Sequence, residues 1–133
     1  MELTDEAIST PADSTPWNEL LRVVGESGSC LAKPEAVREY LAQFPDVAPV
    51  VANHLRAART EFGNSAQVFL DLYRDPEIDD EYLRVRVRLS HYGEDFLRRL
   101  RSISDARDED LSRISGYVSV TTDYHPAALH GAV

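Results

Sequence analysis

Residues 82–90, YLRVRVRLS, constrain the fold of this chain more than any other part of the sequence. Apolar side chains and arginines alternate along them, with the period of two that a β-strand produces and a helix cannot. Residues 67–74, QVFLDLYR, alternate in the same way and are separated from the first run by the acidic, turn-forming residues 75–81. The two runs therefore predict an antiparallel hairpin with one apolar face and one face of arginines and aromatic rings.

Apolar residues at helical spacing predict three helices before this hairpin and one after it. The spacing places them over residues 16–24, 34–44, 47–62 and 94–103, with prolines in first turns and glycines after last turns. Residues 104–110 either continue the last helix or bend it. A third strand is predicted over residues 117–124, which return to alternation.

The order α-α-α-β-β-α-β predicts an α+β fold, a two-layer sandwich with the helices on one face. A right-handed crossover through the last helix makes the third strand parallel to the second. Because residues 67–74 carry apolar side chains on both faces, we expect this first strand at the centre of a three-stranded mixed sheet of order 2-1-3. Residues 1–33 are expected to form an N-terminal arm with a short docked helix, residues 34–125 a single α+β domain, and residues 126–133 a frayed tail.

Composition excludes several classes of protein. The 133 residues include 14 basic and 23 acidic side chains, and a formal net charge of −9 disfavours nucleic acid and anionic membranes as partners. The chain has no long apolar run and no signal-peptide pattern, so we expect a cytoplasmic protein with no membrane association. The single cysteine, Cys30, follows a flexible link and fits a reducing compartment.

Residues 67–124 contain a characteristic order of turn and core residues. A short hydrophobic strand runs into an acidic turn, an alternating strand follows, and a helix leads to a last short strand. The residues that carry the pattern are Asp75-Pro76-Glu77, Glu81, Phe96, Leu100 and Ile103. This segment, less than half of the chain, resembles a group of small, uncharacterised bacterial α+β proteins. Some members look like one half of a two-gene module of the toxin–antitoxin type, so the resemblance implies a protein that acts through a protein partner.

The face of arginines and aromatic rings is the strongest candidate site. Its predicted contact residues are Phe69, Tyr73, Arg84, Arg86, Arg88 and Tyr117. Arginines and aromatic rings dominate the hot spots of protein interfaces. Two other interpretations are a solvated face, on which Asp71 pairs with an arginine across the strands, and a platform for single-stranded nucleic acid. We favour a non-enzymatic interaction protein, the antitoxin or accessory half of a module, which binds an unidentified protein partner or a second copy through this face.

A small metal-assisted hydrolase is the enzymatic alternative, and the acidic loop is its first candidate site. Asp75, Glu77 and Asp79 occupy alternate positions, as do the first ligands of a calcium loop. Asp80, however, stands where the sharp turn of such a loop needs glycine, and Arg86 stands where it needs a bidentate glutamate. The pattern therefore favours a solvated hairpin loop.

The second candidate metal site combines residues from separate parts of the chain. His91, Asp123 and His125 could meet at one edge of the sheet as a site of two histidines and one carboxylate. The sequence contains no phosphate-binding glycine loop and no G-x-S-x-G nucleophile elbow. We therefore assign no catalytic residue and expect no cofactor.

Overall fold

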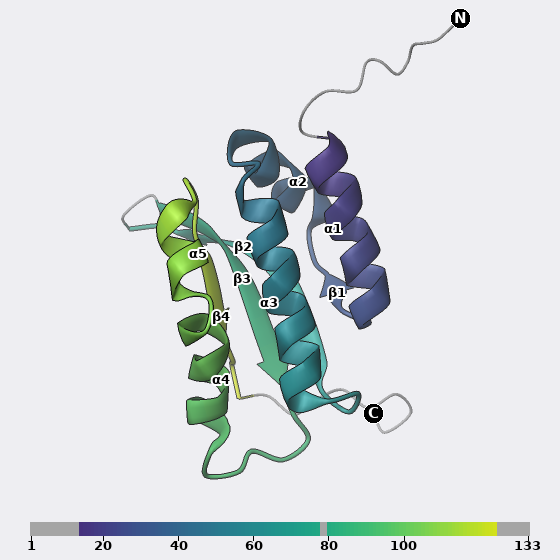
Figure 1. The fold of residues 1–133 in the computed structure, drawn as a ribbon, viewed down its shortest axis with the longest axis vertical. Helices are drawn as coiled ribbons and strands as arrows, with labels where there is room; N and C mark the ends of the chain where they lie inside the picture. Colours follow the sequence, from purple (N-terminus) through teal and green to yellow (C-terminus); the bar gives the residue numbers. More distant parts are fainter. Residues whose placement is uncertain (1–13, 78–79, 125–133) are drawn as a thin grey trace, which may run out of the picture.

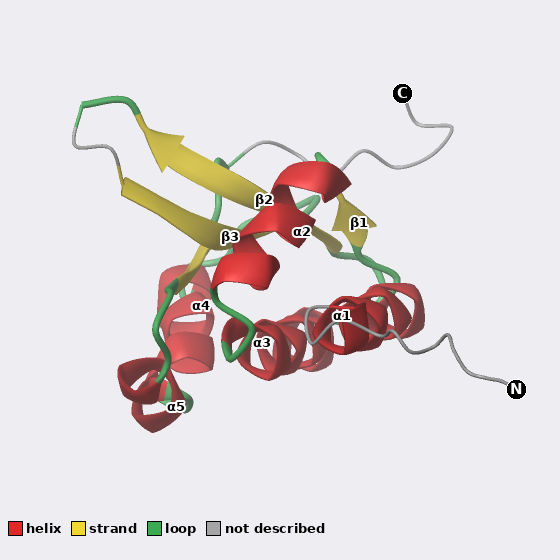
Figure 2. Cartoon of the chain, turned by 90° about the horizontal axis from the view of Figure 1, so that it is seen from above, coloured by secondary structure: helices red, strands yellow, loops and turns green. Residues whose placement is uncertain are grey.

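The structure is a computed structural model that describes residues 14–77 and 80–124. Within these residues it has five helices and four strands, and the predicted mixed α+β class is confirmed. In chain order they are α1 (Ser14–Ser27), β1 (Cys30–Leu31), α2 (Pro34–Gln43), α3 (Val47–Phe62), β2 (Gln67–Asp75), β3 (Asp80–Arg88), α4 (Phe96–Asp105), α5 (Asp108–Arg113) and β4 (Val118–Thr121). The helices lie on one side of the sheet, as predicted (Figures 1 and 2). Residues 1–13 of the predicted N-terminal arm (residues 1–33) and the predicted tail over residues 126–133 lie outside the described residues.

The sheet has the order β1-β2-β3-β4, and this corrects the predicted order. β2 and β3 form the expected antiparallel hairpin, in register from Gln67↔Arg88 to Asp75↔Asp80. β4 is parallel to β3, as the crossover rule predicts, but it lies beside β3 and not beside β2. The predicted order 2-1-3 is therefore wrong, because the other edge of β2 pairs with a strand that the sequence analysis did not predict.

That additional strand, β1, makes the sheet four-stranded instead of three-stranded. It lies parallel to β2 with the register Cys30↔Phe69, and the backbone N–H of Ala32 donates to the carbonyl of Leu70 at 2.9 Å. Cys30 is thus an exposed residue of a short strand. Two residues are too few to show a period of two, so the sequence pattern carried no signal for this element.

The core fills the space between the helix layer and the inner face of the sheet. Val47, Val51 and Leu55 of α3 have no exposed surface, and Val85 and Val87 of β3 lie equally deep. α1 packs along α3 (Figure 1) and adds its three most buried apolar side chains to the same core. No helix in the described residues is both long and apolar enough to cross a membrane.

The loop between α5 and β4 is fixed by residues from α2 and from the start of α3. Asp46, the residue at the N-terminal end of α3, makes no side-chain capping hydrogen bond and accepts hydrogen bonds from the backbone N–H and hydroxyl of Ser115 at 3.0 and 2.8 Å. Tyr40 Oη accepts a hydrogen bond from the backbone N–H of Tyr117 at 2.9 Å. A Cβ on Gly116 would lie 2.6 Å from that oxygen, so glycine is required there for close approach.

His54 is a titratable side chain with no exposed surface in the helix layer. Its Nδ1 donates to the Val50 carbonyl at 2.8 Å, and its Nε2 has no hydrogen-bond partner among the described residues. Burial lowers the pKa of His54 below 6.5, and Arg107 lowers it further, while the Val50 carbonyl and Asp110 act in the opposite direction. The folded protein therefore holds this imidazole neutral.

We expect the free energy of unfolding to fall as the pH decreases through 6.5. Below that value the unfolded chain takes up a proton at His54 that the folded chain excludes, and the loss levels off below the folded pKa. Urea unfolding between about pH 7.5 and 5.5 measures this slope. The variant His54→Gln should show a flatter profile, and equal slopes for the two proteins would contradict the assignment.

Candidate functional site

The alternation along β2 and β3 and the register of β4 place a set of polar and aromatic side chains on the side of the sheet that faces away from the helices. We call this surface the outer sheet face. Its residues are Phe69, Asp71, Tyr73, Asp75, Asp80, Tyr82, Arg84, Arg86, Arg88, Tyr117, Ser119, Thr121 and Asp123. All six residues that the sequence predicted as partner contacts lie on it.

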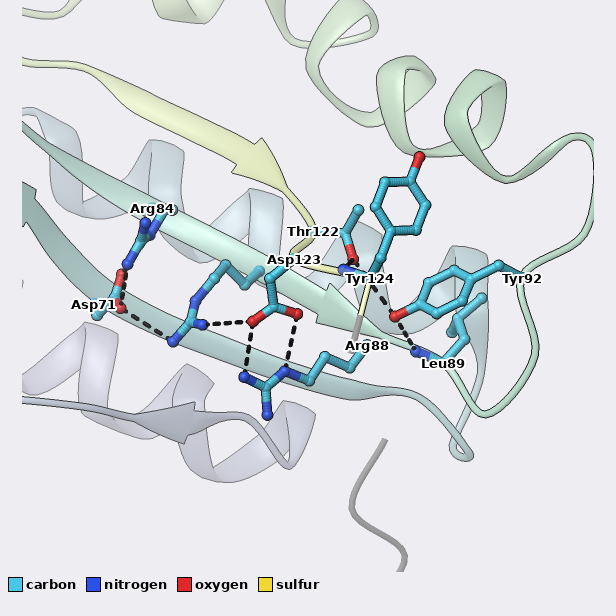
Figure 3. A network of polar contacts seen from close by, with 9 residues as sticks. Asp71, Arg84, Arg88, Leu89, Tyr92, Thr122, Asp123 and Tyr124 are labelled. Carbon is cyan, nitrogen blue, oxygen red and sulfur yellow. Dashed lines mark hydrogen bonds and ion pairs between the residues drawn. The ribbon is translucent and has the colours of Figure 1, made fainter. Parts of the chain in front are cut away.

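An ion-pair network, which we call the arginine ladder, crosses the centre of the outer sheet face (Figure 3). Arg84 donates from Nε and Nη2 to the two carboxylate oxygens of Asp71, at 3.0 and 2.9 Å. Arg86 bridges Asp71 at 3.2 Å and Asp123 at 3.0 Å. Arg88 donates from Nε and Nη2 to Asp123 at 3.1 and 2.8 Å. Three arginines share two aspartates, which leaves one surplus positive charge.

The same three arginines also pack over two aromatic rings, those of Tyr73 and Phe69. The Arg84 guanidinium lies 4.9 Å from the ring centroid of Tyr73, and those of Arg86 and Arg88 lie 5.4 and 4.8 Å from Phe69. The hydrogen bonds that Arg84 donates to Asp71 and Arg88 donates to Asp123 raise the pKa of each arginine above the ordinary arginine value. The three arginine side chains are only 19–25% exposed. Their guanidinium groups are therefore held in place by their neighbours and do not extend freely into solvent.

Three tyrosines form a second group beside the ladder, toward the tip of the hairpin. We call Tyr73, Tyr82 and Tyr117 the tyrosine cluster. The ring of Tyr82 lies 5.2 Å from that of Tyr73 and 5.6 Å from that of Tyr117, centroid to centroid. Tyr117 is 52% exposed. Burial, and then the neighbouring Tyr73, raise the pKa of Tyr82, which keeps its hydroxyl protonated. Tyr82 was missed as a site residue, although it has the same strand parity as Arg84.

The candidate calcium ligands of the acidic loop, which the sequence pattern already disfavoured, are only partly among the described residues. The Asp75 carboxylate accepts the backbone N–H of Glu77 at 2.9 Å, an interaction that shapes the turn. Asp79 lies outside the described residues. In the part of the chain that the structure describes, no group of three histidine, cysteine or carboxylate side chains could hold a metal ion.

The second predicted metal site is likewise not assembled among the residues described. Both carboxylate oxygens of Asp123 accept hydrogen bonds from the arginine ladder. His91 is an exposed residue of the loop between β3 and α4, and His125 lies outside the described residues. The sequence offered Asp123 only as a candidate ligand, and the structure places its carboxylate beside Arg86 and Arg88 of β3.

One large cavity lies away from the outer sheet face. It has a volume of about 730 Å³ and lies between α3 and the α4–α5 segment. Its charged side chains are Arg56, Glu61, Arg107 and Asp110, and neither histidine nor cysteine lines it. Glu61 is paired with Arg99 at 2.6 Å. None of the residues predicted as partner contacts or metal ligands borders this cavity.

Comparisons of the chain with models of known protein families, with curated proteins and with solved structures find no match. The likeness of residues 67–124 to two-gene modules therefore stays a prediction.

Proposed function

We propose that the outer sheet face is a docking surface for another protein. The chain is then a non-enzymatic interaction protein of the bacterial cytoplasm, the antitoxin or accessory half of a two-protein module. The observation that carries this proposal is the position of the tyrosine cluster directly beside the arginine ladder, on a sheet face that the described helices leave open.

Tyrosine and arginine are the residue types that contribute most to protein interfaces. Here the arginines are already held by Asp71, Asp123 and two rings, so binding a partner immobilises little additional side-chain freedom. The half-exposed ring of Tyr117 offers apolar area and a hydroxyl to the same partner. The face therefore combines a preorganised polar centre with an aromatic anchor.

Single-stranded nucleic acid is a weaker fit to the same surface. Base stacking would use the rings, but phosphates need uncompensated positive charge along the strand. The arginine ladder retains one surplus positive charge, and Asp75 and Asp80 stand next to the tyrosine cluster on the same face. These carboxylates would repel a phosphate backbone.

Native co-purification from the source organism tests the proposal. We expect a stoichiometric second protein, measured by light scattering and mass spectrometry. Tyr117→Ala should reduce its capture by at least about tenfold, because a partly exposed anchor is removed without opening the core. Leu97→Ala, on the helix side and 46% exposed, is the matched control and should retain capture.

Equal capture by wild type and Tyr117→Ala would contradict docking at the outer sheet face. Loss of capture in both variants would also contradict it. The ladder arginines are unsuitable for this first test, because Asp71 is only 7% exposed and would lose its counterions.

A further inference from the structure

The tip of the β2–β3 hairpin carries a cross-strand pair of like charges. Asp75 lies opposite Asp80. Both are on the outer sheet face, two residues along each strand from the pair Tyr73↔Tyr82. Like charges in this position destabilise an antiparallel pair. No ion pair found among the described residues involves either aspartate, and the Asp75 carboxylate accepts the backbone N–H of Glu77, which is a neutral donor. No opposite charge therefore offsets the repulsion there.

The other charged cross-strand pairs of the hairpin are complementary. Arg74 is paired with Glu81 on the inner side, and Asp71 with Arg84 on the outer sheet face. Asp75↔Asp80 is the exception, and it lies beside the tyrosine cluster. A cation from another molecule would convert this repulsion into two attractive contacts.

The protein itself shows how such a cation can be held. Arg84 stacks on Tyr73 at 4.9 Å while it binds Asp71 through two hydrogen bonds. The same types of group, two carboxylates and an aromatic ring, are present at Asp75, Asp80 and Tyr82. No ion pair among the described residues places an arginine on these two aspartates. An aromatic ring next to carboxylates accommodates both the charge and the aliphatic stem of arginine or lysine.

We infer that the outer sheet face recognises a basic segment of its partner, with an arginine or lysine side chain bound by Asp75 and Asp80 and packed on the tyrosine cluster. This inference rests on the proposed function and specifies the chemistry of the partner. The net charge of −9 favours encounter with a basic partner and disfavours a second copy of this chain.

An NMR titration of the full chain with a synthetic peptide of alternating arginine and glycine tests the inference. We expect the largest amide shifts at Asp80, Tyr82 and Tyr117. A control peptide of alternating glutamate and glycine should cause no shifts. Asp75→Asn/Asp80→Asn should weaken binding by about tenfold. Asp105→Asn/Asp108→Asn removes the same charge from exposed positions on the helix side and should bind like wild type.

Equal weakening by the two double variants would show unspecific attraction to an acidic protein and would overturn the inference. Shifts confined to the helix side would overturn it as well. A dimer in sedimentation equilibrium that dissociates on Tyr117→Ala would make the occupant a second copy, which also rejects a basic partner segment.

A stability measurement provides a readout independent of the peptide. Asp80→Lys should raise the Tm by about 1–3 °C, because it replaces a repulsive cross-strand pair by an attractive one. The same variant should abolish the arginine–glycine peptide shifts at Tyr82. An unchanged or lower Tm, or retained peptide binding, would contradict the role assigned to the pair.

The co-purified protein separates failure of this inference from failure of the docking proposal. Capture that is lost with Tyr117→Ala but retained with Asp75→Asn/Asp80→Asn would keep the docking face and reject the basic segment. Capture that is retained with both variants would reject both.

Discussion

Asp71→Ala is expected to lower the free energy of unfolding by about 2–4 kcal/mol, because it removes a largely buried carboxylate that two arginines share. Arg84 would lose both of its hydrogen-bond acceptors, and Arg86 would lose one of two. The lower end of the range applies if water reaches the guanidinium groups, which are 25% and 19% exposed. Urea denaturation monitored by circular dichroism measures the change.

Asp95→Ala is the matched control for this prediction. Its carboxylate is 48% exposed and lies 3.6 Å from Arg98 in a surface pair, so its loss should cost less than about 0.5 kcal/mol. A loss below about 1 kcal/mol for Asp71→Ala would show that the arginine ladder contributes no more than a surface ion pair. The outer sheet face would then lack the rigid centre on which the docking proposal depends.

Arg59→Ala is expected to cost about 2–4 kcal/mol, because one guanidinium satisfies four backbone carbonyls. Its Nε donates to Ser27 at 2.7 Å and its Nη2 to Gly28 at 3.1 Å, at the end of α1. Its Nη1 donates to Gly63 at 2.7 Å and to Ala66 at 2.8 Å, between α3 and β2. This single side chain therefore joins the segment before β1 to the segment before β2.

Two further variants decide whether geometry or charge matters at this position. Arg59→Lys keeps the charge, but one ammonium group cannot reach four carbonyls in two directions, so most of the loss should remain. Arg56→Ala, one turn earlier in α3, removes an exposed arginine whose carboxylate partner lies 3.7 Å away and should have almost no effect. Full stability of Arg59→Lys would contradict the proposed clamp.

The outer sheet face was largely predictable, because alternate residues of a strand point to opposite faces of the sheet. The run from Leu83 to Arg88 placed three arginines on one side, and the matching run placed Phe69 and Tyr73 on the same side. The predicted pairing of Asp71 with an arginine across the strands was also confirmed, since the hairpin register places Asp71 opposite Arg84.

Asp123 could not be assigned in the same way. It belongs to a segment that meets β3 only through the crossover, and its arginine partners are 35 and 37 residues away in the chain. The order of the strands depends on the same long-range placement, and β1 was too short to alter any pattern.

The sequence by itself determined the elements whose causes are local. These are the start of α2, the bounds of α3, the hairpin, and the side of the sheet to which each hairpin residue points. Only the tertiary structure decided which strand lies beside which, that Asp46 binds Ser115, and that Asp123 completes the arginine ladder. The physical reason is the range of the interactions. Periodicity and turn chemistry act within a few residues, whereas these contacts join groups that only the packing of the helix layer on the sheet brings together.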